Sequence, residues 1–451
     1  MVLKRRIDTR WWVLFCCCCI VFFPAFFDFQ VSVLVQRLTG TAIECINGID
    51  TCLNFSLYQF NILASMDYWT RAVAGVFAGI IIDKYGTKFA LWGSAVGMIV
   101  STLIFTLGSY VKTTTGAYIM MLLGRLLFGL VTGGYSVIIH RVKAGWFKHK
   151  ELALAFSTEI FFDKFATAIA FLLYGGILGS IGLRGVLWLS FFLTVISAIA
   201  LGIIAHLDSA RTSAMVWTGT ADTRPRTIWF SLQYFDAVYW LLVAILLFYE
   251  ASVQPLIADG PLYFAGAYGY SEATASYLTG LIYDLCFLAP IVGWLTDRYG
   301  RRDYGLFFLM AITCLAYLLA LTLKTTFPAV LLTLFVGIGF TSYSSILWSS
   351  IPLLVTHESI GLALGLGKLV ASAGGAAGMV TAGAILNTGS STGDLPWDSF
   401  FIFLLVLSSV CVVISPLIIY LNTMTGYRLT LSQRQKADDA VSEVTPINTS
   451  F

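Results

Sequence analysis

Apolar residues form long, nearly unbroken runs along most of the chain, and short polar segments separate them. Each run is close to the roughly 20 residues that a helix needs to cross the hydrocarbon core of a membrane. The runs cover residues 11–35, 62–82, 89–110, 117–140, 151–177, 184–206, 236–257, 272–296, 303–323, 327–353, 359–387 and 398–422. The pattern therefore predicts an all-α membrane protein with 12 transmembrane helices.

A polar segment with Arg211, Arg224 and Arg226 divides these runs into two groups of six. We expect a cytosolic N-terminus (1–10), an N-terminal six-helix bundle (11–206), a cytosolic central loop (207–235), a C-terminal six-helix bundle (236–422) and a disordered cytosolic tail (423–451). The first run is too long for the core of a signal peptide and lacks a small-residue cleavage pattern, which indicates a membrane helix.

The basic residues predict the orientation. With the N-terminus in the cytosol, sixteen Lys and Arg residues fall in the N-terminal segment and the inside loops. The outside loops hold only Arg37, Lys112, Arg184 and Lys324. Because Lys and Arg concentrate in cytosolic loops, both termini should be cytosolic.

Composition excludes several classes of protein. Among 451 residues, 58% are hydrophobic and 11% are charged, and the mean hydropathy is +0.84. A soluble domain carries roughly 25% charged residues, so this chain has too few to cover a water-facing surface. A net charge of +3 gives no reason to expect nucleic acid as a partner. The nine cysteines and four histidines show neither metal-ligand nor catalytic spacing, so we expect no enzyme and no cofactor.

The strongest local pattern occurs twice, about half a chain length apart. A Gly-x3-Asp-basic-x-Gly segment follows the second predicted helix and again the eighth. Its key residues are Asp83, Lys84, Gly86 and Lys88 in the first copy, and Asp297, Arg298, Gly300 and Arg301 in the second. An ordinary cytosolic loop explains the basic residues but not the same frame at matching places in both halves.

This repeated loop resembles the signature of the major facilitator superfamily, whose transporters consist of two six-helix halves. Gly124-Arg125, followed by further glycines, is similar to the fourth-helix motif of that family. The resemblance implies a gating role for the residues of both loops and for Arg125. In the family, the loop Asp latches the cytosolic face in the outward-open state.

Shorter segments resemble one branch of the family, the lysosomal dipeptide transporters. They are Gln59-Phe60-Asn61, Trp69, Trp146–Leu152, Tyr268–Ser271, Leu347-Trp348 and Gly361–Gly365. This resemblance implies a lysosomal membrane, dipeptide transport as uniport or proton-linked transport, and a glycosylated accessory subunit. Neither terminus shows an acidic dileucine sorting signal, so the plasma membrane stays open as an alternative.

Charged residues inside predicted membrane helices are candidate site residues, because an ionisable group in hydrocarbon is costly. Lys164 and Asp284 lie near mid-depth on helices that should face each other. Together they could bind the carboxylate and the amine of a zwitterionic peptide. A salt bridge that only holds the two halves together is an equal alternative.

The chain also departs from the branch. The branch has an Arg where Lys164 stands, and an acid where Tyr135 stands, and tyrosine cannot pair ionically with an amine. Glu250 is the best substitute acid, and Asp28 matches an acid of the branch. Tyr343 and Trp348 are further candidates for the cavity lining, although aromatic packing explains them too.

Three functions follow. We favour a carrier of small amino-acid-like solutes, most of all dipeptides. An organic-anion or monocarboxylate carrier would need Lys164 but no acidic partner. A receptor or scaffold on the same fold would have no need for the signature loops or the charges inside the membrane.

The first outside loop contains Cys45 and Cys52, for which a disulfide is an even expectation, and the glycosylation sequon Asn54-Phe55-Ser56. A disulfide there would place the loop in an oxidising compartment. Cys16 to Cys19 lie near the cytosolic end of the first helix, where we expect lipid-facing or palmitoylated side chains.

Overall fold

The computed structural model describes residues 2–42, 45, 52–147, 152–217, 235–355, 360–388, 395–424 and 429. Within these ranges the description does not include some helical side chains, among them those of residues 2–10, 76–87, 297 and 298. Nearly all of the described chain is helical, and no described residue belongs to a strand.

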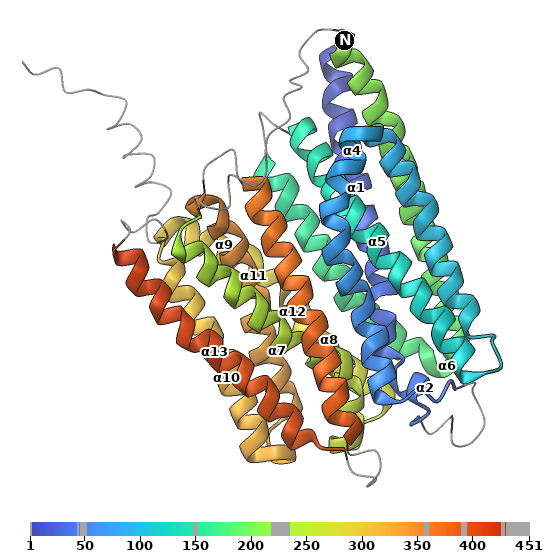
Figure 1. Cartoon of the computed structure of the whole chain (residues 1–451), viewed down its shortest axis with the longest axis vertical. Coiled ribbons are helices and arrows are strands. Elements are labelled where there is room, and N and C mark those ends of the chain that lie inside the picture. The colour runs from blue at the N-terminus through green and yellow to red at the C-terminus, as the bar shows by residue number, and fades with distance from the viewer. Residues whose placement is uncertain are drawn as a thin grey trace, which may run out of the picture.

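The first bundle consists of α1 (Val2–Val33), α2 (Val35–Thr39), α4 (Leu57–Gly108), α5 (Thr114–Phe147) and α6 (Leu152–Trp217). Helices α4 and α6 each contain two of the predicted spans. Both helices turn back on themselves (Figure 1), and in α6 the turn includes Gly182, whose φ of 67° favours glycine. Helix α4 begins with a capping box at Ser56, whose hydroxyl accepts a hydrogen bond from the backbone N–H of Gln59.

The second bundle consists of α7 (Ala237–Tyr268), α8 (Glu272–Asp284), η2 (Leu285–Phe287), α9 (Leu288–Tyr299), α10 (Arg302–Leu323), η3 (Lys324–Thr326), α11 (Ala329–Leu354), α12 (Ile360–Thr388) and α13 (Trp397–Met424). The predicted span 272–296 is divided into α8, η2 and α9, which follow one another without a loop. Nine described segments are long and apolar enough to cross a membrane, and one of them, Thr158–Asp208, contains both limbs of α6.

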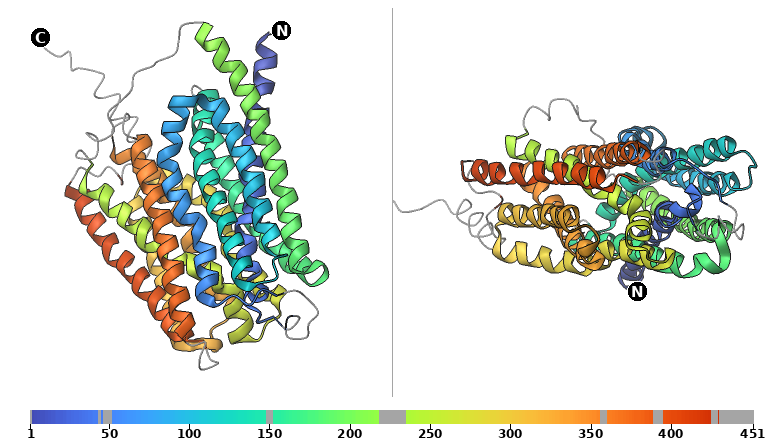
Figure 2. Two further views of the ribbon diagram at one scale, coloured as in Figure 1. Left: turned by 45° about the vertical axis from the view of Figure 1, so that its right-hand side comes forward. Right: turned by 90° about the horizontal axis from the view of Figure 1, so that it is seen from below.

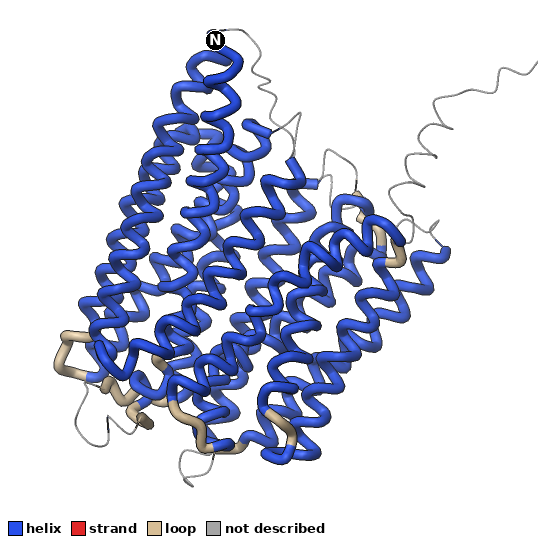
Figure 3. Tube along the Cα trace, turned by 180° about the vertical axis from the view of Figure 1, so that it is seen from behind, coloured by secondary structure: helices blue, strands red, loops and turns tan. Residues whose placement is uncertain are grey.

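The two bundles lie side by side with their helices roughly along one direction (Figure 2), and the view from behind shows the same arrangement (Figure 3). The start of α1 and the end of α13 lie at the same end of the molecule (Figure 1). The loop with Cys45 and Cys52 lies at the opposite end, which we call the outer end because the sequence predicts that it faces away from the cytosol.

Several helices extend beyond their predicted ends, α6 and α7 by the most. α6 continues to Trp217, past the predicted start of the central loop at residue 207. α7 continues to Tyr268, past the predicted end of its span at residue 257, and contains Pro255 and Pro261. Proline inside a membrane helix is tolerated because neighbouring groups satisfy the freed backbone.

The cysteine run on α1 also differs from expectation. Cys16, Cys17 and Cys18 are buried and Cys19 is half-buried. The lipid-facing interpretation of this run was therefore wrong for the first three thiols. They pack inside the first bundle, where small polarizable side chains fill the space between helices.

Several polar contacts join the bundles, and four of them form a series from the outer end toward the middle. Arg37 of α2 pairs with Glu272 of α8 at 3.0 Å, and the Gln36 amide donates to the Pro261 carbonyl at 3.3 Å. Deeper, the Asn61 amide donates to Asp259, and the Tyr68 hydroxyl donates to Gln254, each at 3.1 Å. The outer halves of the bundles are thus held together, so the structure is an outer-closed state.

Candidate functional site

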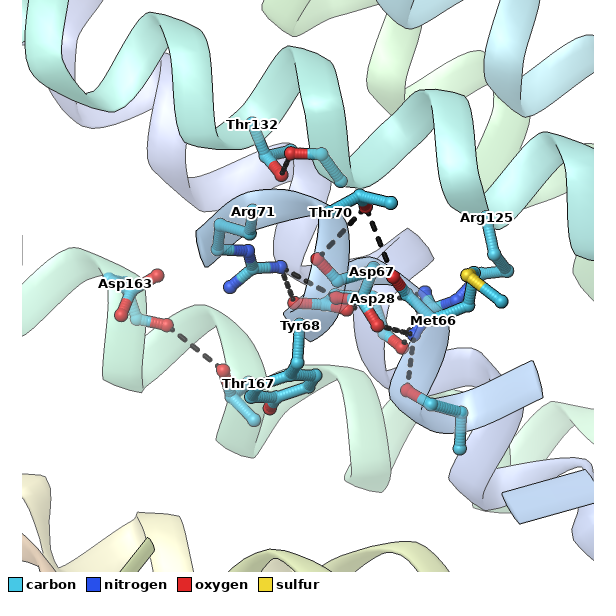
Figure 4. A network of polar contacts seen from close by, with 12 residues as sticks. Asp28, Met66, Asp67, Tyr68, Thr70, Arg71, Arg125, Thr132, Asp163 and Thr167 are labelled. Atoms are coloured by element: carbon cyan, nitrogen blue, oxygen red, sulfur yellow. Dashed lines mark hydrogen bonds and ion pairs between the residues drawn. The ribbon is translucent and has the colours of Figure 1, made fainter. Parts of the chain in front are cut away.

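Four charged side chains meet inside the first bundle: Asp28 of α1, Asp67 and Arg71 of α4, and Arg125 of α5 (Figure 4). We call them the charge cluster. Arg71 lies 2.8 Å from both carboxylates. Arg125 lies 2.7 Å from Asp67 and 3.2 Å from Asp28. The i,i+4 pair Asp67–Arg71 is one edge of a larger network.

The charge cluster balances two guanidinium groups against two carboxylates. The side chains of Asp67 and Arg125 are 0% and 2% exposed, so each needs a charged partner. Arg125 also donates to the backbone carbonyls of Ala64 and Asp28 from its two terminal nitrogens, a fork that the single ammonium of lysine does not offer. The expected gating residue Arg125 and the expected cavity residue Asp28 are thus partners in one neutral unit.

A chain of hydrogen bonds leads from this cluster into the second bundle. The Tyr68 ring lies next to Arg71, with the guanidinium carbon 5.2 Å from its centre. The Tyr68 hydroxyl donates to Gln254, whose amide donates to Glu250 at 2.9 Å. A small cavity of about 10 Å³ between the bundles is lined by Asp28, Tyr68 and Gln254 among others, which is close to the smallest space that holds one water.

Glu250 of α7 accepts hydrogen bonds from neutral side chains, Gln254 and the Tyr343 hydroxyl, the latter at 2.7 Å. No cation within the described part of the chain forms an ion pair with Glu250. Two neutral donors therefore hold its carboxylate in place without a direct ion pair. This carboxylate can therefore bind a cationic group of a solute.

Lys164 of α6 contacts a group of aromatic rings that Tyr343 connects to Glu250. We define Tyr283, Phe340 and Tyr343 as the aromatic wall. The Lys164 ammonium nitrogen is 5.6 Å from the ring centres of both Tyr283 and Phe340, within cation–π range. Phe340 in turn contacts Tyr343, with 6.1 Å between ring centres. The ammonium is 3.5 Å from Asp163, whose side chain is 46% exposed, so water screens that pair.

Lys368 of α12 adds a second cation to this region. The charges that act on it include Lys164, Arg71, Glu250 and Asp163. Apart from the neutral charge cluster, two lysines and two carboxylates thus lie close enough to interact electrostatically. A solute with one positive and one negative group leaves this set of charges neutral.

Asp284 does not accompany Lys164. It is exposed and lines a separate crevice of about 250 Å³ between α6 and α8, with Leu172 and Tyr277. Asp284 and Tyr283 face different directions because consecutive residues of a helix are rotated by about 100° about its axis. Tyr283 faces Lys164 and the aromatic wall, so Asp284 points elsewhere.

Two other sequence-predicted site residues lie in packed surroundings. Tyr135 is 6% exposed and belongs to the apolar core of the first bundle, with Leu91 and Ile138. Trp348 is half-buried and packs near Gly367 of α12. Tyr343 is fully buried but contacts Glu250, so it holds the carboxylate rather than lining open space.

The gating residues predicted in the signature loops are only partly described. The side chains of Asp83, Lys84, Asp297 and Arg298 lie outside the described part of the chain, and so does the environment of Gly86. Lys88 is exposed. Gly300 and Arg301 both have positive φ, 70° and 54°, and form the turn between α9 and α10.

The outer loop contains the two features expected from its sequence pattern. Cys45 and Cys52 form a disulfide with 5.7 Å between their Cα atoms. Asn54 is exposed at the same end of the molecule, directly before the Ser56 cap of α4. Glycosylation of Asn54 stays a prediction.

Sequence reasoning missed Asp259, which is 0% exposed and binds Asn61 of the other bundle. The predicted span ended at residue 257, so Asp259 was assigned to a loop. The buried run of α7 on both sides of Asp259, up to Phe264, shows that it lies inside the bundle. The neutral residues Tyr68 and Gln254 carried no signal that would have selected them.

Comparison with known proteins decides the family. The sequence profile of the Major Facilitator Superfamily matches residues 14–289 and 261–442. The chain belongs to this superfamily. It is similar to the lysosomal dipeptide transporter MFSD1 of Homo sapiens, with 26% identity over 84% of this chain and 82% of that protein. The protein of the same name from Gallus gallus is 25% identical over 90% of each chain.

Solved structures show the same fold. A D-xylose-proton symporter superposes with a TM-score of 0.65 at 13% identity, covering 91% of this chain and 97% of that one. A nucleoside transporter superposes with a TM-score of 0.61 at 13% identity, covering 90% and 99%. The protein is a membrane transporter of the major facilitator fold, and the family is one of transporters rather than enzymes.

Proposed function

We propose that this transporter carries dipeptides and related zwitterionic solutes by alternating access, with the carboxylate of the solute at Lys164 and its amine at Glu250. The observation that carries the proposal is that two opposite charges, Lys164 and Glu250, contact the same aromatic wall. Within the described residues, Glu250 is held by neutral donors, and the one carboxylate that pairs with Lys164 is water-screened. Both charges are therefore available to a solute.

The geometry fits a dipeptide in two respects. The charges come from opposite bundles, Lys164 from α6 and Glu250 from α7, so a solute that bridges them couples binding to the relative position of the bundles. The aromatic wall that both charges contact offers apolar surface to side chains of varied size, and ring faces impose little sequence selectivity. The similarity to the lysosomal dipeptide transporters supports the same cargo.

Three further parts of the proposal rest on that similarity and on the sequence. The protein resides in the lysosomal membrane, where peptides from protein digestion leave, and the plasma membrane is the alternative. A glycosylated accessory subunit protects it on the luminal side. The two signature loops act as the cytosolic gate, with Asp83 and Asp297 as latches, and transport is uniport or proton-linked.

The test compares solutes that lack one charge. Uptake into proteoliposomes is measured for a dipeptide, its N-acetyl derivative and its C-terminal amide, with wild type, Lys164→Gln and Glu250→Gln. We expect wild type to reject both derivatives. Glu250→Gln should transport the dipeptide poorly and no longer distinguish it from the N-acetyl form, while Lys164→Gln should lose discrimination against the amide.

The matched control is Lys324→Gln, which removes an exposed pair with Asp398 and should leave all three rates unchanged. Wild-type rates that are equal for all three solutes would contradict the proposal. Uptake of monocarboxylates that needs Lys164 but not Glu250 would support the organic-anion carrier instead. A tagged chain that is absent from lysosomes and present at the cell surface would refute the proposed location.

A further inference from the structure

Asp259 and Asn61 form a buried contact between the two bundles, away from the charges of the proposed solute site. Both side chains are 0% exposed. The Asn61 amide nitrogen donates to one Asp259 oxygen at 3.1 Å and to the Leu57 carbonyl at 3.1 Å. The pair lies on the outer side of the small cavity, between the Tyr68–Gln254 contact and the outer ion pair Arg37–Glu272.

Two atoms of this pair have no hydrogen-bond partner within the described part of the chain. They are the second carboxyl oxygen of Asp259 and the amide oxygen of Asn61. Both are acceptors when Asp259 is ionised, so neither can satisfy the other. A buried polar atom without a partner costs about 1–3 kcal/mol, and an uncompensated buried charge costs more.

Neighbouring charges do not offset an ionised Asp259. On the elements packed against this part of α7 the charged groups are engaged elsewhere or lie toward a helix end. Asp28, Asp67 and Arg71 belong to the charge cluster, and Glu250 accepts from Tyr343. Two ion pairs lie at the outer end, Arg37 with Glu272 and Lys324 with Asp398. The remaining charged residues are Asp284, which lines its own crevice, and Lys368. Lys368 is 15 residues from Gly383, the α12 residue that contacts Asn61, which corresponds to about 22 Å of helix. The α11 helix carries no charged residue.

We propose that Asp259 binds a proton in the outer-closed state and that this proton completes a cyclic carboxylic acid–amide pair with Asn61. The proton on the second carboxyl oxygen is donated to the Asn61 amide oxygen, while the Asn61 amide still donates to the first. One proton thus satisfies both unpartnered atoms and removes the buried charge. No covalent bond other than this O–H bond forms or breaks.

The pair joins α4 of the first bundle to α7 of the second, so it must separate when the outer end opens. Separation exposes Asp259 to water, where an aspartate with an ordinary pKa of about 3.9 is ionised at neutral pH. The closed state therefore holds a proton that the open state releases. Lower pH favours the state that binds more protons, so acid favours outer closure, by at most about tenfold in the closed-to-open ratio per pH unit.

This inference rests on the alternating access of the proposed function but not on its cargo. Its test needs no solute. Spin labels at Lys112 of the first bundle and Thr325 of the second, both exposed at the outer end, report the distance between the bundles by double electron–electron resonance. Cys19 and Cys314, which are half-buried, are replaced by Ser in the labelled protein.

For wild type we expect the short-distance population to grow as the pH falls from 8 to 5. Asp259→Asn should show the short distance at every pH, because its amide supplies a donor without a proton. The control Glu272→Gln breaks another outer contact and should shift the populations while keeping the pH dependence. As a second measurement, wild type in the closed state should show the infrared C=O band of a buried carboxylic acid, and Asp259→Asn should lack it.

Three results would overturn the proposal. They are a distance distribution of the wild type that does not change with pH, a pH dependence that persists unchanged in Asp259→Asn, and an infrared band that this substitution leaves in place. None of these results bears on whether dipeptides are transported. Conversely, failed dipeptide uptake with an intact pH response would reject the cargo and keep the proton site.

Discussion

Removing Arg125 from the charge cluster offers a quantitative test of how the first bundle is stabilised. Arg125→Met keeps a long apolar side chain of similar reach but deletes two ion pairs, at 2.7 Å to Asp67 and 3.2 Å to Asp28. Two carboxylates then remain with Arg71 alone. The cluster changes from neutral to a net charge of −1 in a buried place.

The expected magnitude follows from the burial. Breaking a buried ion pair from one side costs about 3–5 kcal/mol, because the partner charge is left without compensation. Asp67→Asn alone leaves an uncompensated positive charge and should cost a similar amount. The double variant restores neutrality with Asp28 and Arg71, which remain 2.8 Å apart. We therefore expect it to be more stable than the sum of the single effects predicts, by about 2–3 kcal/mol.

The assay is equilibrium unfolding in mixed micelles, with sodium dodecyl sulfate as denaturant and tryptophan fluorescence as the signal. The four proteins of the cycle are wild type, the two single variants and the double variant. Arg184→Met is the matched control. Arg184 is half-buried beside Tyr110, with 4.5 Å to the ring centre, and has no carboxylate partner among the described ion pairs, so it should cost under about 1 kcal/mol.

Strictly additive single effects would refute the reasoning, because they would mean that Arg125 and Asp67 do not compensate each other. The same conclusion would follow if Arg125→Met cost no more than Arg184→Met. In either case the charge cluster would be solvated enough for water to replace the missing partner.

Three further predictions concern packing, glycosylation and the disulfide. Gly378→Ala should lower the unfolding midpoint, because its new Cβ would collide with the Ala251 backbone of α7, whereas Gly365→Ala, with open space around it, should not. An intact Gly378→Ala midpoint would show that α12 can move away from α7. Asn54→Gln should abolish the mobility shift that glycosidase treatment causes in wild type, and a shift that persists would place the sugar elsewhere. Cys45→Ser should make Cys52 reactive toward a membrane-impermeant maleimide in lysosomes only after their membrane is permeabilised, and labelling in intact lysosomes would reverse the predicted orientation.

Hydropathy predicted the helices well because each must be apolar along its whole length to lie in lipid. The predicted spans 303–323 and 327–353 correspond to helices that begin and end at Arg302–Leu323 and Ala329–Leu354. The errors lie where hydropathy carries no information. Polar residues on α7 after residue 257 ended the predicted span, although this helix is buried by protein there and continues to Tyr268.

Site prediction from the sequence depended on which face of a helix each residue occupies. A charged residue in an apolar run was a sound signal, because Lys164, Glu250, Asp28 and Arg125 all lie between or within the bundles. Which charges meet was not encoded locally. Lys164 and Asp284 share a depth, but Tyr283 rather than Asp284 faces Lys164. The pairing of Arg71 with Asp28 joins residues 43 apart in sequence, which only the packing of α1 on α4 can bring about.

All four members of the charge cluster belong to α1, α4 and α5, so the cluster lies entirely within one bundle. In the alternating access proposed above, the bundles rock against each other, and these ion pairs travel as a rigid piece without breaking. The contacts that do break are single hydrogen bonds such as Tyr68–Gln254, each worth about 1 kcal/mol, and one ion pair at the outer end. The protein thus separates what must be permanent from what must be reversible. The ion pairs of the charge cluster fix the packing of helices within the first bundle. In the proposed mechanism, the weaker contacts between the bundles set how fast the transporter changes from one access state to the other.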